Sequence, residues 1–231
     1  MTADLRDLLL SAPLFDGIPQ SACAGVAESG RLREYEAGSV VFAEGEPATS
    51  FFVVLSGSVK LVQLTEDGDA IVFRLLGHGE AFGTVCLFGS GPYPVSAVAV
   101  TPTALARWPA AVMRAHLEQQ PRLSLNVLRS VSDRLQALRL QYRQLATEKV
   151  ERRVARAVLK LVQHAGTQVG DGVLVDLPLS REDLAQLTGT TVYTVSRIVS
   201  RWEAAGILRS GRQQLVIRDA RTLTAIADDI G

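Results

Sequence analysis

The stretch that decides the fold spans residues 180–206 and has the sequence SREDLAQLTGTTVYTVSRIVSRWEAAG. Ser180 and Asp183 have the spacing of a capping box, which predicts that a helix begins here. Gly189 ends this short helix, because glycine readily takes the positive φ that a tight turn requires. Apolar residues then recur with helical periodicity up to Trp202. These signals together predict a helix-turn-helix.

Two further residues have the spacing that a helix-turn-helix needs. Ala185 is small at the point where the second helix must cross the first closely. Val195 is a branched apolar residue at the position that locks the second helix onto the first. Ala185, Gly189 and Val195 thus meet three constraints at fixed spacing, which makes this motif the most specific signal in the chain.

The outward face of the second helix carries hydroxyl groups and arginines, and residues 190–202 include no acidic residue. A helix in the major groove of DNA needs such a face, because carboxylates repel the DNA backbone while arginines and hydroxyls bind phosphates and base edges. We expect Arg197 to contact a guanine and Arg201 to contact a phosphate. The predicted DNA contacts are Ser180, Thr191, Tyr193, Thr194, Ser196, Arg197, Arg201, Arg209 and Arg212.

Other elements are expected around this motif. Residues 206–208 and 215–217 predict two strands, and residues 209–212 predict a tight basic turn between them. Such a wing can touch phosphate through the arginines at its tip. Ahead of the motif we expect a helix over residues 148–164 and a glycine-rich turn over residues 166–172.

The middle of the chain is helical in character, because residues 122–165 contain neither glycine nor proline. Pro121 fits the first turn of such a helix. Apolar residues spaced alternately three and four apart form a heptad seam flanked by Arg and Gln, which predicts that two copies pair in parallel. The alternative is a helix packed on its own domain's core, which usually needs a wider apolar stripe. The predicted dimerisation residues are Leu128, Val131, Leu135, Leu138, Tyr142 and Leu145.

Before Pro121, short runs of β-branched and aromatic residues alternate with glycine-containing turns. This pattern is typical of an antiparallel barrel or roll. The cluster Glu66-Asp67-Gly68-Asp69 predicts a hairpin turn. The predicted strands cover residues 40–42, 51–55, 59–64, 71–76, 95–100 and 105–108.

The chain is therefore predicted to be an α+β protein with three parts. An antiparallel β-roll sensor domain covers residues 1–120, a dimerisation helix residues 121–147, and a winged helix DNA-binding domain residues 148–231. The 231 residues carry 24 basic and 24 acidic side chains, so any affinity for DNA must come from a local patch. The start does not resemble a signal peptide, and no apolar run is long enough to span a membrane, so we expect a cytoplasmic protein without a membrane partner.

Four segments resemble the bacterial CRP/FNR family of transcription regulators. Residues 35–46 and 52–61 resemble the start and the central hairpin of the family's cyclic-nucleotide-binding β-roll, and residues 79–85 resemble its phosphate cassette. Residues 189–197 resemble the helix-turn-helix of the FNR branch. The resemblance implies a homodimer on palindromic double-stranded DNA, controlled by a small-molecule effector in the roll, with RNA polymerase as a partner.

The chain departs from the cyclic-AMP members of the family in the cassette. Those members carry a ribose-binding glutamate where this chain has Thr84, and an Arg-Ser pair for the phosphate where it has Val95-Ser96. Residues 81–106 contain no charged residue, and a buried phosphate without a partner is very costly. Cyclic AMP is therefore not the expected effector, which stays unidentified. The candidate effector-pocket residues are Gly83, Thr84, Ser96, Leu138 and Arg139.

The sequence also bears on which cofactors the chain could bind. The FNR-type iron–sulfur cluster is not expected, because the N-terminal cysteine cluster of those members is absent. Haem stays open, since an uncharged stretch suits an apolar cofactor, although His78 lies in a predicted turn. Cys86 is expected to be a buried core residue rather than a redox switch. No catalytic or metal site is predicted.

One base contact and the function of the whole chain are left with alternatives. FNR-type members have a base-reading glutamate where this chain has Tyr193, which cannot copy that contact. A second interpretation of the whole chain is a ligand-binding regulatory module that acts on a protein partner without binding DNA. That interpretation predicts acids on the second helix or a disrupted turn, and neither is seen.

Overall fold

A computed structural model describes residues 5–64, 70–89, 91–170, 172–175, 180–211 and 214–228. They form two compact units, which divide between Ala137 and Leu138 inside a long helix; residues 70–72, at the start of a strand of the first unit, group with the second. Within the described ranges, no helix has both the length and the apolar character needed to cross a bilayer.

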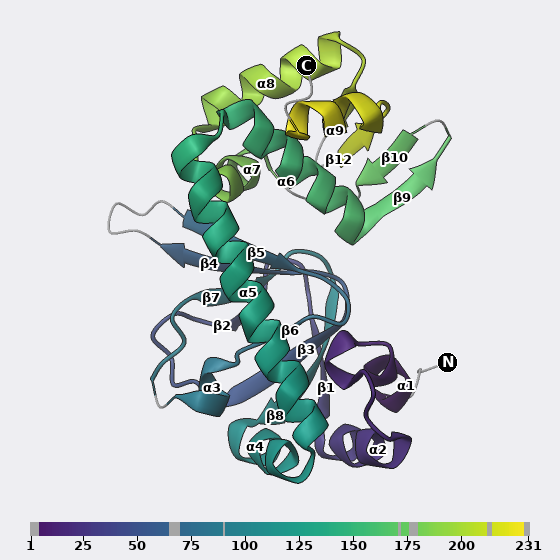
Figure 1. Cartoon of the computed structure of the whole chain (residues 1–231), viewed down its shortest axis with the longest axis vertical. Coiled ribbons are helices and arrows are strands. Elements are labelled where there is room, and N and C mark those ends of the chain that lie inside the picture. The colour runs from purple at the N-terminus through teal and green to yellow at the C-terminus, as the bar shows by residue number, and fades with distance from the viewer. Residues whose placement is uncertain are drawn as a thin grey trace. The chain divides into compact units, whose positions relative to one another are not determined.

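The first unit is a β-roll with helices at its N-terminal and C-terminal ends (Figure 1). Its helices are α1 (Leu5–Leu10), the 3-10 turn η1 (Pro13–Phe15), α2 (Gln20–Ser29), α3 (Val85–Phe88) and α4 (Ala110–Gln119). Its strands are β1 (Arg31–Tyr35), β2 (Val40–Phe42), β3 (Ser50–Ser56), β4 (Val59–Leu64), β5 (Ala70–Leu76), β6 (Ala81–Phe82), β7 (Ser96–Ala99) and β8 (Thr103–Pro109).

Two four-stranded sheets make up the roll, with strand orders β1-β8-β3-β6 and β2-β7-β4-β5. The strand pairs β1–β8, β3–β8, β3–β6, β2–β7 and β4–β7 are antiparallel, with Phe51 opposite Trp108 in the first sheet and Leu61 opposite Ala97 in the second. The predicted antiparallel roll is confirmed. The expected turn at Glu66–Asp69 lies outside the described residues.

Strand β3 is buried on both faces, because the roll covers one face and helices cover the other. Phe51, Val53 and Leu55 belong to a core shared with α2, α4 and the first turns of the long helix. Phe52 and Val54 point to the opposite face, as alternation along a strand requires, and pack inside the roll. A strand covered on both sides appears as a continuous apolar run, which is what residues 51–55 show.

The long helix α5 (Pro121–Thr147) begins at the predicted proline. Its first turns bury one face, formed by Leu123, Asn126 and Val127. The Asn126 side-chain amide donates to the carbonyls of Leu14 (2.9 Å) and Asp16 (2.8 Å), which fastens α5 to the N-terminal segment. The six residues of the predicted seam do not belong to this buried face, and all are exposed.

The second unit is a winged helix-turn-helix. It contains α6 (Val150–Ala165), β9 (Gly166–Val169), β10 (Gly172–Val175), α7 (Arg181–Thr188), α8 (Val192–Ala204), β11 (Leu208–Gly211), β12 (Gln214–Ile217) and α9 (Ala220–Asp228). Its sheet has the order β11-β12-β10-β9. The core joins apolar residues of α6, α8 and α9 with those of β11 and β12, among them Val158, Trp202, Leu208, Ile217 and Leu223.

Two sequence-based expectations about elements need correction, and one further strand was missed. Residues 166–172 are not simply a turn, since β9 and β10 pair there, with Val173 opposite Gln168. Arg209 is not at the tip of the wing but inside β11, where it pairs with Val216. Strand β1 was not predicted, because four of its five residues are exposed and it carries little apolar signal.

Candidate nucleic-acid interface

The first helix of the motif, α7, begins at the predicted capping box. The Ser180 hydroxyl accepts from the Asp183 backbone N–H (3.0 Å), and the Asp183 carboxylate accepts from the Ser180 backbone N–H (2.9 Å). Each side chain therefore satisfies a backbone donor that the helix leaves unpaired. Ser180, a predicted DNA contact, lies exposed at this N-cap and its hydroxyl also donates to Asp183 (2.7 Å).

The turn between α7 and α8 is centred on Gly189, whose φ is +61°. The Gly189 and Thr190 backbone N–H groups both bond to the carbonyl of Ala185. This is the pattern by which a left-handed glycine closes a helix C-terminus. The predicted positive φ is confirmed.

Helix α8 packs against α7 through the residues that the sequence indicated. Ala185 is buried and leaves room for close approach, and Val195 is fully buried. Ile198, Val199 and Trp202 continue the buried face with helical spacing. The opposite face of α8 is therefore free to meet a ligand.

That opposite face, which we call the recognition face, consists of Tyr193, Ser196, Arg197, Ser200 and Arg201. The Tyr193 side chain is 76% exposed and Arg197 is exposed. Within the part of the chain that the structure describes, Arg197 forms no ion pair. Its guanidinium is therefore available to an acceptor on a ligand.

Thr191 and Thr194 lie at the start of α8 and serve a local purpose. The Thr191 hydroxyl accepts from the Thr194 backbone N–H (3.2 Å), which makes Thr191 the N-cap of α8. The two hydroxyl oxygens are 3.0 Å apart. Both side chains remain at the surface beside the first turn of the recognition face.

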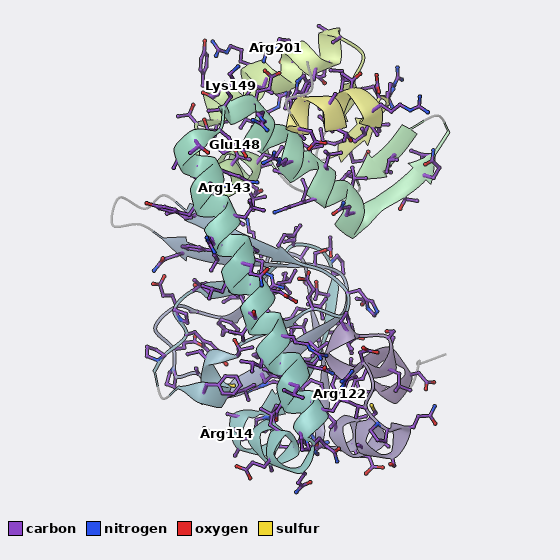
Figure 2. All side chains as sticks on the ribbon, in the orientation of Figure 1. Arg114, Arg122, Arg143, Glu148, Lys149 and Arg201 are labelled. Carbon is purple, nitrogen blue, oxygen red and sulfur yellow. The ribbon has the colours of Figure 1, made fainter. Side chains whose placement is uncertain are left out.

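Arg201 differs from Arg197 because it has a partner within the chain. Its Nη2 atom lies 2.8 Å from Oε1 of Glu151, the second residue of α6. The same oxygen accepts from the Trp202 indole N–H (2.9 Å). Arg201 is labelled on α8 in Figure 2. No local sequence pattern indicates the role of Glu151, because its partner lies 50 residues away in the chain.

The wing is joined to α8 by a second acidic side chain. The Glu203 carboxylate accepts from the Ser210 hydroxyl (2.5 Å) and from the Ser210 backbone N–H (2.9 Å). These bonds, the hydroxyl first, hold the pKa of Glu203 below its usual value. Arg209 on β11 is exposed. Arg212 lies outside the described residues.

The candidate effector residues fall in both units. Gly83 has a φ of +76° and Thr84 precedes α3, while the Ser96 hydroxyl accepts from the Glu44 backbone N–H (2.9 Å). Leu138 and Arg139 are exposed residues of α5 in the second unit. Ser96, the candidate pocket residue at the family's phosphate position, thus already accepts a hydrogen bond from the backbone.

Aromatic side chains fill the interior of the roll. Phe42 stacks on Tyr93 at 3.7 Å between ring centroids, and Phe52 stacks on Phe82 at 5.0 Å. The Tyr93 hydroxyl donates to the Ser50 carbonyl (2.8 Å). All four aromatic residues are buried, so an apolar ligand in this space would have to displace them.

Cys86 and His78 have the surroundings of structural residues. Cys86 is buried, and desolvation raises the pKa of its thiol to about 11, which keeps it protonated at neutral pH. His78 is exposed, with Nδ1 lying 2.7 Å from the Leu55 carbonyl and Nε2 3.0 Å from the Ser11 hydroxyl. Metal binding by His78 would cost one of these contacts. Over the described ranges, no group of three or more His, Cys, Asp or Glu side chains could hold a metal ion.

A β-roll joined by a long helix to a winged helix-turn-helix with an acid-free, arginine-bearing recognition face defines a DNA-binding transcription regulator with a separate sensor domain. Comparison with known families agrees. Residues 32–120 match the cyclic nucleotide-binding domain, and residues 152–226 match the Crp-like helix-turn-helix domain.

Relatives match over nearly the whole chain. The cyclic AMP receptor protein of Thermus thermophilus is 31% identical over 94% of this chain and 97% of its own length. The CRP-like cAMP-activated global transcriptional regulator of Mycobacterium tuberculosis is 29% identical over 95% of this chain and 98% of its own. The solved structure of a CRP/FNR-family transcriptional regulator from Thermus thermophilus is 26% identical, with a TM-score of 0.75 over 87% of this chain and all of that one. The chain belongs to the CRP/FNR family of transcription regulators, as the sequence motifs indicated.

The turn geometry generates a prediction for Gly189→Ala. A Cβ atom there would lie 2.5 Å from Cδ2 of Leu145, which is half-exposed and can move aside. The left-handed φ is not relieved by that movement, so we expect the variant to lose about 1–2 kcal/mol of stability. Thermal unfolding followed by circular dichroism measures the loss as a lower melting temperature.

Gly211→Ala is the matched control, because its Cβ would meet no atom within 4 Å and its φ is not left-handed. An unchanged melting temperature for Gly189→Ala would contradict the assigned turn.

Proposed function

We propose that two copies of this chain bind a palindromic DNA site, with each copy placing α8 in the major groove. The two recognition helices would then lie about 34 Å apart, one turn of the double helix. An effector in the β-roll controls this binding, RNA polymerase is the partner in transcription, and the protein acts in the cytoplasm. The observation that carries the proposal is the recognition face, which itself contains no acidic residue and whose Arg197 forms no ion pair among the described residues.

Pairing of two copies is supported by the exposed seam on α5. Leu128, Leu135 and Tyr142 are 62%, 69% and 77% exposed, although α5 buries other residues against the roll. Large apolar side chains in a heptad register are costly in water unless a partner covers them. A second copy of α5 has the same pattern, so in a parallel pair the seam of each helix covers the seam of the other.

The effector is proposed to be something other than cyclic AMP. Two of the relatives are named for cyclic AMP, but this chain has Thr84 and Val95 at the two positions where charged groups bind that ligand in the family. The Ser96 hydroxyl accepts a bond from the Glu44 backbone. A phosphate there would lack the bidentate arginine that makes its burial tolerable.

Base reading by Arg197 can be tested with Arg197→Ala on full-length protein. A palindrome first selected by the wild type from a random DNA pool serves as the operator, and a random duplex serves as the reference. We expect the variant to lose about 1–3 kcal/mol of binding free energy on the operator and little on random DNA, because a base contact carries sequence information. Fluorescence anisotropy at fixed salt measures both affinities.

Arg209→Ala is the control, since an exposed wing arginine acts through phosphates and should weaken both complexes alike. Equal losses on both DNAs for Arg197→Ala would show that Arg197 is not a base reader. A wild type without any preference among sequences would favour the alternative of a protein-binding module.

The seam is tested by Leu135→Glu. A carboxylate at a seam position must be desolvated when two helices pair, so we expect the variant to become monomeric while the wild type has twice the mass of one chain. Light scattering after size-exclusion chromatography gives the mass. Gln136→Glu adds the same charge one residue away, outside the seam, and should stay dimeric. A dimeric Leu135→Glu protein would contradict the seam.

The effector proposal is tested by calorimetric titration with cyclic AMP. We expect no binding by the wild type, because two charged partners of the ligand are missing. The double variant Thr84→Glu with Val95→Arg restores both charged partners in an otherwise unchanged chain and is the matched comparison. Saturable binding of cyclic AMP by the wild type in the micromolar range would overturn this part of the proposal.

A further inference from the structure

The first turn of α6 contacts the turn that precedes α8 and the C-terminal half of α8. Helix α6 begins just after the corner formed by Glu148 and Lys149 at the end of α5 (Figure 2). Glu151 bonds to Arg201 and Trp202 in the C-terminal half of α8. Arg153, two residues further on, reaches the turn that precedes α8. Neither residue is part of the helix-turn-helix itself.

Arg153 donates three hydrogen bonds to backbone carbonyls. Its Nε donates to the carbonyl of Thr188 (2.9 Å), which is the last residue of α7. Its Nη2 donates to the carbonyl of the turn glycine, Gly189 (3.3 Å). Its Nη1 bonds to the Glu148 carbonyl (2.8 Å) at the α5–α6 corner. A helix leaves its last carbonyls without partners, and the rigid guanidinium fork supplies donors in fixed directions. Arg153 thus ties the turn of the motif to the corner after α5.

The same turn also meets the last seam residue of α5. A Cβ atom on Gly189 would lie 2.5 Å from Leu145 Cδ2, so the absent side chain leaves the space that Leu145 occupies. Contacts with α5 and α6 therefore also hold the turn from which α8 leaves. Of these contacts, the Arg153 fork is the one that holds backbone atoms by hydrogen bonds.

We propose that Arg153 is a positioning residue for base recognition. It does not touch DNA; it holds the Thr188–Gly189 turn so that Arg197 meets the base edges in bonding geometry. Base contacts require accurate placement, whereas attraction to phosphates tolerates displacement of the helix. Losing the fork should lower affinity for an operator much more than affinity for random DNA. This inference rests on the proposed sequence-specific binding.

The test compares Arg153→Gln with Arg152→Gln in the full-length chain. The control removes the same charge from the adjacent residue of α6, whose Nε bonds to the Ala227 carbonyl (3.4 Å) on α9 and not to the turn. The probes are the palindrome selected by the wild type and a random duplex of equal length. The readout is the ratio of the two affinities, because a smaller folded fraction lowers both affinities and leaves the ratio unchanged.

We expect Arg153→Gln to reduce this ratio by about tenfold, the scale of one lost charge-assisted hydrogen bond, while Arg152→Gln keeps it. Arg153→Lys retains the charge but not the fork, and we expect it to have an intermediate ratio. A wild-type ratio in folded Arg153→Gln overturns the inference and leaves the proposed function intact. A wild type without operator preference overturns the proposed function instead.

Folding is monitored by circular dichroism. If Arg153→Gln unfolds, the folded Arg153→Lys variant decides: a reduced ratio supports the inference, and a wild-type ratio overturns it. Unfolding of both variants also overturns it, because Arg153 would then maintain the fold rather than the placement of α8.

Discussion

The left-handed backbone at Gly189 determines where α8 can lie. Only a residue without a side chain takes this φ at low cost and also leaves room for Leu145. Once the turn is made, Val195 and Ile198 enter the core, and the opposite side of α8 must face outward. The hydroxyl groups and arginines of the recognition face point outward as a consequence of this single turn. The capping box at Ser180 fixes where the motif begins, and Gly189 fixes its angle.

The helix-turn-helix could be predicted from sequence because all its signals are local. Capping, the turn glycine and the apolar period fall within 27 residues, 180–206. The heptad seam on α5, which stays a prediction, also rests on local signals. The strand pair β9–β10 was not predicted, because Gly166, Gly170 and Gly172 signal turns, and pairing depends on β12, which lies far along the chain.

Contacts between distant residues explain what the sequence could not show about the site. Arg153 and Glu151 are two charged residues on an amphipathic helix, and either could have been a solvated side chain. Their bonds to Thr188 and Arg201 appear only once α6, α7 and α8 are packed together. The same holds for Ser96, whose partner Glu44 is 52 residues away. Local patterns predict elements, but the choice of partner for a polar side chain is a property of the packed fold.

The pairing of Arg201 with Glu151 affects how the regulator behaves when it is not on its target. An arginine whose charge is balanced internally attracts a passing polyanion less than a free one does. The chain as a whole has no net charge, so few long-range forces hold it to arbitrary stretches of the chromosome. We therefore expect only weak binding to the vast excess of competing sites, and a shorter search for the correct one. An intramolecular carboxylate can in this way favour selectivity without ever contacting a base.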